Sequence, residues 1–474
     1  MTSIFSFQNS YTVLPDRMYA RVDPEPSRTP AMLAFNEPLA NEIGLTGLKG
    51  SSDLAALFSG QKVPDGAIPI AQAYAGHQFG NFVPSLGDGR AVLLGDIVDP
   101  KGKPWDIQLK GSGRTPYSRG GDGKAWLGPV LREYVVSEAM HHLGIPTTRA
   151  LGVALTGETI VRAEGGVPGA IVTRVASSHI RVGTFQYFAA RRDVEALKAL
   201  FEYALKRHYP QCNTPLEFLE AVFAKQSKLV TKWLGVGFIH GVMNTDNTAI
   251  SGETIDYGPC AFMDSYHPAT VFSSIDRRGR YAYMSQPDII VWNVAQLASS
   301  LLFLEEDQDV AIDAYTKAVH SMPDRLKQDR LDVFAAKLGI SNPESQDADL
   351  VENLLTNMMN AHLDFTNTFR DLATQDHPAF LNGIKDGDKW FAAWQTRLQS
   401  QPDPKAVMLS ANPHYIPRNH MVEAMIQSAL QGDMSQFENM NTVFRHPYTE
   451  QSGAETYAKP PRPDQEIEAT FCGT

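Results

Sequence analysis

One stretch, HGVMNTDNTAISGETIDYGPCAFMD (240–264), holds the residue types best suited to chemistry. Asn247 and Asp256 stand nine positions apart and offer hard oxygen ligands, the type that Mg²⁺ prefers. Asp246 is a carboxylate beside that pair, and such a group can take a proton from an attacking hydroxyl. We expect the intervening TAISGETI to form two short strands about a turn at Ser251-Gly252, which would fold the two ligands towards each other. The ordinary alternative is a loop with two Asx turns.

The same stretch has the order of a protein-kinase catalytic centre with one part missing. A kinase loop reads H-R-D-L-x-x-x-N, in which the Asp is the base and the Asn holds a metal ion, and Asp-Phe-Gly follows. His240 and Asn247 fall in register with this pattern, and Tyr257 replaces the Phe. Val242 occupies the position of the base and cannot accept a proton. The chain is therefore either an inactive kinase-like scaffold or an enzyme whose chemistry is rearranged around Asp246.

Residues upstream of this stretch offer groups that could hold a triphosphate. In the turn SLGDGR, Gly87 and Gly89 let the backbone approach a ligand closely, and Arg90 adds a positive charge. Lys110 ends a predicted strand, and Glu133 lies 23 residues further on, inside a predicted helix. In kinases a strand Lys contacts the ATP phosphates and pairs with a helix Glu. Each feature alone has an ordinary alternative, a hairpin turn or a pair of surface charges. They support nucleotide binding only when they are taken together with the catalytic stretch.

Two further groups are candidates for phosphate binding. The loop GGDGKAW contains Asp122 and Gly123, where consecutive backbone amides can form an anion nest. Arg174 and Arg181 flank the sequence VASSHI, and two arginine forks could hold a polyphosphate chain. The alternatives are a flexible connection for the loop, and solvation or ion pairing for the arginines.

Hydrophobic patterns predict the elements that must position these residues. Residues 91–98 and 105–110 favour two strands joined by the turn DPKGKP. Residues 130–145 have apolar side chains at helical spacing, and GETIVRAE and GAIVTRVA favour a hairpin. The segment 85–175 therefore reads strand, strand, helix, strand, strand. A helical-looking segment, AMLAFNEPLANEIGL, lies nearer the N-terminus.

Helical periodicity dominates the rest of the chain, in segments 193–209, 215–235, 287–304, 309–322 and 349–372. A β-rich lobe followed by an α-rich lobe, with the catalytic stretch near the junction, is the order of a kinase-like fold. We expect an α+β, protein-kinase-like bilobal fold in four parts: an N-terminal extension packed on the core (1–80), a β-rich nucleotide-binding lobe (81–190), an α-helical lobe with the catalytic and metal site (191–445) and a partly mobile C-terminal tail (446–474).

Composition limits the classes of function. The chain has 474 residues, of which 43% are hydrophobic and 20% charged, and its formal net charge of −11 argues against a general nucleic-acid binder. Cys212, Cys260 and Cys472 lack metal or redox spacing, and the N-terminal residues show no secretory signal. Residues 289–305 are apolar but contain an Asn and a Gln, so we expect a buried core helix rather than a membrane span. We expect a cytoplasmic protein with no nucleic-acid or membrane partner.

With these motifs assembled, the sequence closely resembles the selenoprotein O family, also called YdiU or UPF0061, from about residue 10 to the C-terminus. The matching stretches include YAGHQFGNFVPSLGDGR, LKGSGRTPYSRGGDGKA, TRVASSHIRVGTFQYF, GFIHGVMNTDNTAISGETIDYGPCAFMD and DRRGRYAY. The resemblance implies a kinase-like fold that binds ATP turned round relative to ordinary kinases. It implies transfer of AMP from ATP to Ser, Thr or Tyr hydroxyls of protein substrates, with Mg²⁺ or Mn²⁺ as the metal. UMP transfer from UTP has also been ascribed to family members.

The resemblance also implies a role for each candidate residue. Asp246 corresponds to the proton acceptor, and Asn247 and Asp256 match the metal ligands. Glu133 matches the helix Glu that pairs with Lys110. The positions that match nucleotide-binding residues are Gly87, Gly89, Arg90, Lys110, Asp122, Gly123, Arg174, Arg181 and Asp256.

The sequence departs from the family pattern in a few places. Lys124 stands where the family often has Arg, and Gly128-Pro129 replaces a serine pair before the helix. Cys472 matches the family's Cys or selenocysteine near the C-terminus, but VFSSIDRRGRY lacks the Cys that many members carry there. We expect Cys472 to act in redox control or partner capture, or else to be an inert exposed thiol.

Three functions are compatible with these residues. The first is an active protein adenylyltransferase, and the second is a catalytically inactive nucleotide-binding pseudokinase that presents a surface to partners. The third, ATP-dependent phosphotransfer, is the least favoured because Val242 stands at the position of the kinase base.

Overall fold

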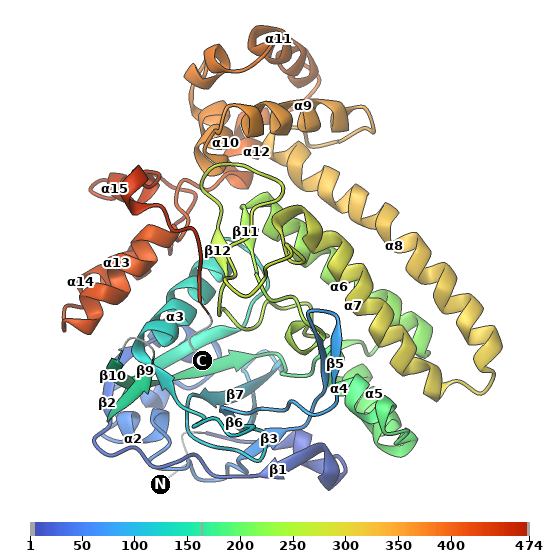
Figure 1. The fold of residues 1–474 in the computed structure, drawn as a ribbon, viewed down its shortest axis with the longest axis vertical. Coiled ribbons are helices and arrows are strands. Elements are labelled where there is room, and N and C mark those ends of the chain that lie inside the picture. The colour runs from blue at the N-terminus through green and yellow to red at the C-terminus, as the bar shows by residue number, and fades with distance from the viewer. Residues whose placement is uncertain (1–4, 163–164, 472–474) are drawn as a thin grey trace.

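The computed structural model describes residues 5–162 and 165–471, and Figure 1 shows a sheet-rich region joined to a helical region. The sheet-rich region is built from the N-terminal part of the chain, and the helices that follow extend away from it. This mixed, bilobal arrangement confirms the expected kinase-like α+β fold class. The redox interpretation of Cys472, and the last two residues of GETIVRAE (163–164), lie outside the described residues.

Within the described chain, eight strands form one antiparallel sheet in the N-terminal lobe. Their spatial order is β1 (Tyr19–Arg21), β3 (Ile70–Gln72), β6 (Ala91–Val98), β7 (Pro104–Lys110), β10 (Gly165–Ala176), β9 (Arg149–Arg162) and β2 (Ala31–Phe35), with β8 (Ala125–Trp126) beside β10. The predicted strands 91–98 and 105–110 are β6 and β7, and the predicted hairpin is β9–β10, so these predictions are confirmed. Nearly all residues of β6 and β7 are buried, which explains their continuous rather than alternating hydrophobicity.

The residues before 80 contribute strands to this same sheet, at both of its edges. The helical-looking segment 31–45 is a helix only in part, because its first residues form β2 and helix α1 (Glu37–Glu42) follows. The change occurs at Asn36, whose side chain accepts a hydrogen bond from the Leu39 amide and caps the helix. β2 forms because it pairs with β9, a long-range contact that local propensity does not encode. A second short helix, α2 (Leu54–Phe58), follows.

Helix α3 (Leu127–His142) packs on β9 and β10 and corresponds to the predicted helix at 130–145. It ends before Gly144, which has a positive φ of 73°, the conformation that commonly stops a helix. On its other side α3 packs against α13 (Asn419–Leu430) and α14 (Ser435–Val443), which come from the far end of the chain (Figure 1). The helix that carries Glu133 is therefore covered on both sides.

The helical lobe contains α4 (Val182–Ala190), α5 (Val194–His208), α6 (Pro215–Gly235), α7 (Gln286–Leu301), α8 (Gln308–Lys337), α9 (Asp347–Asn360), α10 (Phe365–Thr374), α11 (Gly387–Leu398) and α12 (Pro404–Ala411). The predicted helices are confirmed, except that 349–372 divides into α9 and α10. The division occurs because His362 has a positive φ of 52° and Asp364 caps the second helix.

Among the described residues, one segment, Tyr283–Leu304, is long and apolar enough to cross a membrane by length and composition. It contains α7, which packs against α4, α6 and α8. Ile290, Val294 and Leu297 are fully buried in the main hydrophobic cluster. This packing is that of a core helix, as the polar residues in its sequence predict.

Two short strand pairs lie where the lobes meet. β4 (Gly76–Gln78) and β5 (Asn81–Val83) form a hairpin that contacts α4, and β11 (Phe238–Ile239) pairs with β12 (Ala261–Phe262) on either side of the catalytic stretch. Both pairs are only two or three residues long, so their positions depend on the larger elements around them.

The segment after residue 446 contains helix α15 (Glu455–Ala458) and then returns towards the centre of the molecule (Figure 1). The Thr470 hydroxyl donates to Pro259 O at 2.6 Å, which places the described end of the chain beside the loop that follows Asp256. The division of the chain at residues 80, 190 and 445 stays a prediction.

Candidate active site

Residues 240–260 of the catalytic stretch lie between β11 and β12 and are fixed by buried hydrogen bonds. The Val242 amide donates to His240 Nδ1 at 3.3 Å, so Nε2 carries the ring proton and donates to Ile255 O at 2.9 Å. Burial lowers the pKa of His240, which keeps the ring neutral. The Asn247 amide group donates to Val242 O at 3.0 Å. His240 therefore ties the start of the stretch to the residue before Asp256 rather than facing a substrate.

Residues 248–255, all of them described, contain no regular strand, so the prediction of two short strands is wrong. The predicted turn is present, and the Gly252 amide donates to Ala249 O at 3.1 Å. On either side of the turn the chain pairs with distant segments instead of with itself. Ala249 forms a bridge with Arg181, and Thr254 pairs with the loop that precedes β9. Contacts with other parts of the molecule therefore position Asn247 and Asp256.

Four charged side chains meet at the end of β7. Lys110 Nζ lies 2.6 Å from Glu133 Oε2 and 2.8 Å from Asp256 Oδ1. Arg174 Nη2 lies 2.6 Å from Glu133 Oε1, and its Nη1 donates to Gln108 Oε1 at 3.3 Å. Arg174 is paired in register with Gln108, and Lys110 is two residues further along β7, so all three side chains share one face of the sheet.

Positive neighbours keep the carboxylates of this cluster ionised. Burial alone would raise the pKa of Asp256, but Lys110, Arg90 and Arg174 hold that pKa well below its usual range. Burial likewise opposes the charge of Glu133, but Arg174 and Lys110 lower its pKa. Asp256 also has a positive φ of 68°, a backbone conformation that residues other than glycine seldom adopt and that clusters at functional sites.

Asp246 lies in a different environment. Its Oδ2 accepts a hydrogen bond from Gln78 Nε2 at 3.2 Å, whereas its buried Oδ1 has no hydrogen-bond partner within the described chain. Burial raises the pKa of Asp246 to about 6, although Gln78 and Arg181 act to lower it, and the charge of Asp256 raises it further. This carboxyl group therefore exchanges its proton close to neutral pH.

The β4–β5 hairpin closes over Asp246. A Cβ atom on Gly76 would lie 2.5 Å from Asp246 Oδ1, so a side chain at that position would displace the carboxylate. The hairpin is held in place by the His77 amide, which donates to Thr245 Oγ1 at 2.7 Å. Sequence reasoning assigned no chemistry to this hairpin, although its residues lie in one of the stretches that match the family. Gly76 and Gln78 thus contact Asp246, an arrangement that only the structure reveals.

Arg181 lies between the Gly-rich turn and Asp246. Its guanidinium carbon lies 4.2 Å from the centre of the Tyr74 ring, and its Nη1 lies 3.3 Å from Asp88 Oδ1. Burial opposes its charge, but Tyr74, Asp88 and Asp246 hold the pKa of Arg181 above its usual value. Its Nε is buried and has no hydrogen-bond partner among the described residues. Arg181 is therefore a permanently charged group with hydrogen-bonding capacity to spare.

The Gly-rich turn is packed under the side chain of Tyr117. Gly87 has a φ of +73°, and a Cβ atom there would lie 2.3 Å from the Tyr117 ring. A Cβ atom on Gly89 would lie 2.8 Å from the Tyr117 carbonyl oxygen, so both positions require glycine. Arg90, which ends the turn, is close enough to Asp256 for its charge to lower the pKa of that carboxyl group. The turn thus brings one cation to the Lys110 cluster.

Asp122 and Gly123 lie at the far end of the loop that contains Tyr117. Gly123 has a positive φ, and a Cβ atom there would lie 2.0 Å from Gly113 O, so two backbone segments cross closely. The Asp122 carboxylate lies 2.8 Å from Arg162 Nη1 and is 41% exposed. Within the described chain, none of its hydrogen bonds or ion pairs reaches the Lys110 cluster. Asp122 and Gly123 therefore lie apart from the charged cluster that Lys110, Glu133, Arg174 and Asp256 form.

The oxygen-bearing residues fit a divalent cation. The Asn247 side-chain nitrogen donates to Val242 O, so the side-chain carbonyl oxygen is not used in that hydrogen bond. Asp246 Oδ1 is buried without a partner in the described chain, and the charge of Asp256 raises the pKa of Asp246. A bound cation relieves such repulsion between carboxylates. Among the described residues, no group of three or more His, Cys, Asp or Glu is arranged to hold a metal ion, and the candidate set here is two carboxylates and the Asn247 amide oxygen.

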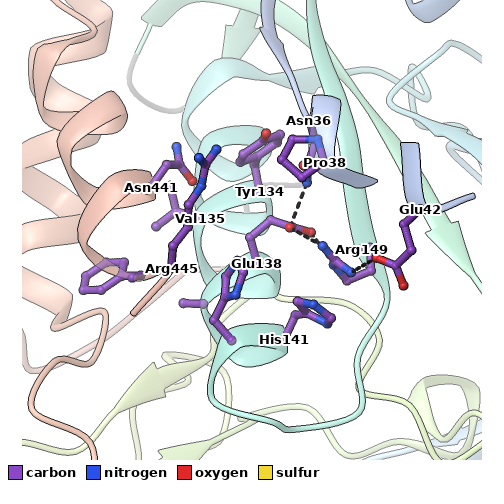
Figure 2. A pocket seen from close by; sticks show the side chains of 13 residues that line it. Asn36, Pro38, Glu42, Tyr134, Val135, Glu138, His141, Arg149, Asn441 and Arg445 are labelled. Carbon is purple, nitrogen blue, oxygen red and sulfur yellow. Dashed lines mark hydrogen bonds and ion pairs between the residues drawn. The ribbon is translucent and has the colours of Figure 1, made fainter. Parts of the chain in front are cut away.

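A second charged cluster, shown in Figure 2, contacts α3 at Glu138. Glu138 accepts hydrogen bonds from Arg149 Nη2 and Asn36 Nδ2, each at 2.7 Å. These groups line a cavity of about 140 Å³ beside α14. Arg445 lines the same cavity. Glu133 and Glu138 are five residues apart, which places them on different faces of the helix. Ion pairs on two faces therefore fix the helix that positions Glu133.

The fold and the site together define a kinase-like protein that retains the Lys110–Glu133 pair and two acidic groups but has Val242 at the position of the kinase base. The family model described as Protein adenylyltransferase SelO matches residues 2–445. The chain therefore belongs to the SelO family, as its motifs predicted, and it is a protein nucleotidyltransferase.

Curated proteins named Protein nucleotidyltransferase YdiU are similar to the chain over its whole length. The protein of Ruegeria pomeroyi is 54% identical over 475 residues, and that of Roseobacter denitrificans is 54% identical over 476 residues, with 100% of both chains covered in each comparison. The protein of Rhizobium meliloti is 51% identical over 488 residues, with 99% of both chains covered.

Proposed function

We propose that this enzyme transfers AMP from ATP to Ser, Thr or Tyr hydroxyl groups of other proteins, and that UTP serves as a second donor for UMP transfer. The observation that carries the proposal is the contrast between two carboxylates. Lys110 and its neighbours hold Asp256 ionised, whereas Asp246 is buried and has a pKa of about 6. A general base works best when its pKa lies near the operating pH. Asp246 meets this requirement, and Val242 does not.

In the proposed reaction, the hydroxyl oxygen of the protein substrate attacks the α-phosphorus of ATP. A bond forms between that oxygen and phosphorus, and the bond from phosphorus to the pyrophosphate oxygen breaks, so pyrophosphate leaves with the electron pair. Asp246 takes the hydroxyl proton. Lys110, Arg90 and Arg174 stabilise the charge of the triphosphate and of the leaving pyrophosphate. The remaining nucleotide-binding assignments, Gly87, Gly89, Asp122, Gly123 and Arg181, are part of this proposal.

Mg²⁺ or Mn²⁺ is the cofactor in this proposal. Asn247 and Asp256 would hold the ion, which when bound supplies positive charge to the phosphates. Asp256 suits this role because its lowered pKa keeps the carboxylate ionised throughout the physiological range. The contact between Lys110 and Asp256 keeps a protein cation beside the same carboxylate.

We also propose that the enzyme works in the cytoplasm on protein substrates, without a nucleic-acid or membrane partner. Cys212 and Cys260 are free thiols, which suits a reducing compartment. The formal net charge of −11 disfavours binding to the phosphate backbone of nucleic acids.

Intact-mass analysis of the purified chain incubated with ATP and Mg²⁺ tests the proposal. Self-modification, or modification of a candidate protein substrate, is expected to add the mass of one adenylyl group (AMP less one water), and EDTA is expected to abolish it. A gain equal to one phosphate would instead indicate phosphotransfer. No gain on the chain or on any of several candidate proteins would favour the inactive scaffold.

A further inference from the structure

A second hollow, away from the Lys110 cluster, gathers positive charge. It has a volume of about 470 Å³ and lies between the β6–β7 turn, α5, α6 and the turn at residues 251–253. Its cationic lining residues are Lys103, Arg207, Lys225, Lys228 and Lys232. Among its described lining residues, Glu253 is the single carboxylate. The net charge of the chain is −11, so composition does not explain this concentration of cations.

Arg207 and Glu253 are already engaged by other groups. Arg207 Nη2 lies 2.6 Å from Asp106 Oδ1, and its Nη1 lies 3.4 Å from Asp96 Oδ2. Glu253 Oε2 accepts a hydrogen bond from the Ser177 hydroxyl at 2.6 Å. The four lysines therefore supply the remaining positive charge of the hollow, which Glu253 near Lys225 and Asp99 near Lys103 offset only in part.

No ion pair in the described chain neutralises these four lysines. Lys103 Nζ lies 3.6 Å from the centre of a Trp ring, Lys225 Nζ lies 4.3 Å from the centre of a Tyr ring, and Lys232 donates to a backbone carbonyl at 2.7 Å. Lys103, Lys225, Lys228 and Lys232 are exposed residues. At Lys225 partial burial lowers the pKa, and Lys103 lowers it further against the opposing effect of Glu253. Burial and the charge of Lys228 lower the pKa of Lys232. An anion in the hollow would relieve this repulsion.

The spacing of the lysines places their charges on one side of a helix. Lys225, Lys228 and Lys232 follow the pattern i, i+3, i+7 and span roughly 10 Å of α6 at about 1.5 Å per residue. Like charges at such spacing slightly destabilise an isolated helix, and the three lysines are exposed, so a bound counter-charge would relieve a modest repulsion. Lys103 adds a fourth charge from the N-terminal lobe. Charges that converge on one hollow from two lobes suit a compact anion better than an extended chain.

We propose that this hollow binds a small polyphosphate anion with two or three linked phosphate groups, supplied as free polyphosphate or as the phosphate tail of a nucleotide. Its volume lies within the roughly 300–1,000 Å³ of small-molecule sites. One wall is the turn that contains Gly252, where a Cβ atom would lie 2.6 Å from Lys225 Cβ. That turn lies between Asn247 and Asp256 in the chain, so the ligand contacts the segment that connects the two proposed metal ligands.

The first test is equilibrium dialysis with labelled inorganic tripolyphosphate in metal-free buffer. The double variant Lys228→Glu/Lys232→Glu is expected to weaken binding about tenfold or more, because charged hydrogen bonds are lost. The control is Lys317→Glu/Lys327→Glu, which changes the net charge equally at exposed positions of α8. It is expected to leave the affinity unchanged. Equal weakening in both variants would overturn the proposal.

Lysine acetylation, read by peptide mass spectrometry, locates the bound anion. Tripolyphosphate is expected to protect Lys225, Lys228 and Lys232 but not Lys317, and binding at the active site is read separately at Lys110. Protection of Lys110 alone would overturn the proposal. Protection by ATP at lower concentration than tripolyphosphate would support it and identify a nucleotide as the source. Stronger protection by a polyglutamate peptide would overturn it in favour of a protein-docking surface. Neither readout depends on nucleotidyl transfer, so failure here leaves the proposed function standing.

Discussion

The regions around Asp246 and Asp256 lie ten residues apart in one loop, yet they give the same type of side chain opposite properties. Around Asp256, the N-terminal lobe supplies Lys110, Arg90 and Arg174, and the pKa of the carboxyl group falls well below its usual range. Around Asp246, the β4–β5 hairpin places Gly76 against the carboxylate, and burial raises the pKa to about 6. The comparison shows that neighbouring elements, rather than the loop sequence alone, hold the pKa of one carboxyl group well below its usual range and raise that of the other to about 6.

The largest expected effect comes from removing the proposed base. Asp246→Ala is expected to lower turnover by ~10²–10⁴-fold, the usual range for general-base help, with ATP affinity little changed in calorimetric titration. The wild-type rate is expected to fall as the pH drops through about 6, because the base must be ionised. Asp313→Ala, at an exposed position of α8, is the control. Unchanged turnover in Asp246→Ala would remove Asp246 from the reaction.

A smaller loss of activity is expected when the wall around Asp246 is changed. Gly76→Ala would place a methyl group 2.5 Å from Asp246 Oδ1, so the carboxylate must move. Misplacement of a catalytic group by about 1 Å can cost ~10²-fold in rate, and we expect a loss approaching that value. In Gly383→Ala the added methyl group meets nothing within 4 Å, so this variant serves as the control. Equal activity in the two variants would show that the hairpin does not position Asp246.

Ionisation of Asp246 and ionisation of Asp256 are expected to change the stability of the fold in opposite directions. The pKa of Asp246 is raised from 3.8 to about 6, so ionisation of this group opposes folding increasingly as the pH rises from about 4 to 6. The pKa of Asp256 is lowered, so its ionised form contributes stability that is present above its ordinary pKa and is lost as the pH falls below it. Thermal unfolding at pH 8 is therefore expected to show a higher Tm for Asp246→Asn and a lower Tm for Asp256→Asn. Shifts of the same sign would contradict the contrast between the two regions.

The smallest effect is expected for Asp122, which lies outside both regions. Its carboxylate is 41% exposed and pairs with Arg162, and such a pair typically contributes ~0.2–1 kcal/mol. Asp122→Ala is expected to lower the free energy of unfolding within that range in urea titrations. A modest loss of ATP affinity is expected because the loop that carries Gly123 is loosened. A loss of ATP affinity as large as that of Lys110→Ala would place Asp122 in direct contact with the nucleotide.

Much of the fold could be predicted because its large elements have strong local patterns. β6, β7, α5 and α6 follow from continuous apolar runs or helical periodicity. Lys110 and Glu133 could be singled out because a strand residue and a helix residue at a fixed order match a known arrangement. Their mutual distance of 2.6 Å then depends only on α3 packing on the sheet.

The rest of the site could not be predicted because it depends on long-range contacts. The strands of the β4–β5 hairpin are three residues long, and its place over Asp246 is set by the hydrogen bond from His77 to Thr245, 168 residues away. Residues 248–255 resemble a hairpin locally but pair with two distant segments. The cations of α6 come together with Lys103 only when the two lobes are joined.

The identity of the transferred group tests the central claim most directly. The enzyme is incubated with a protein substrate, Mg²⁺ and ATP labelled at either the α- or the γ-phosphate, and protein-bound label is measured. The proposal predicts label from α-labelled ATP only, and a loss of that label in Asp246→Ala by the factor given above. Protein-bound label from γ-labelled ATP would contradict AMP transfer and make the enzyme a phosphotransferase.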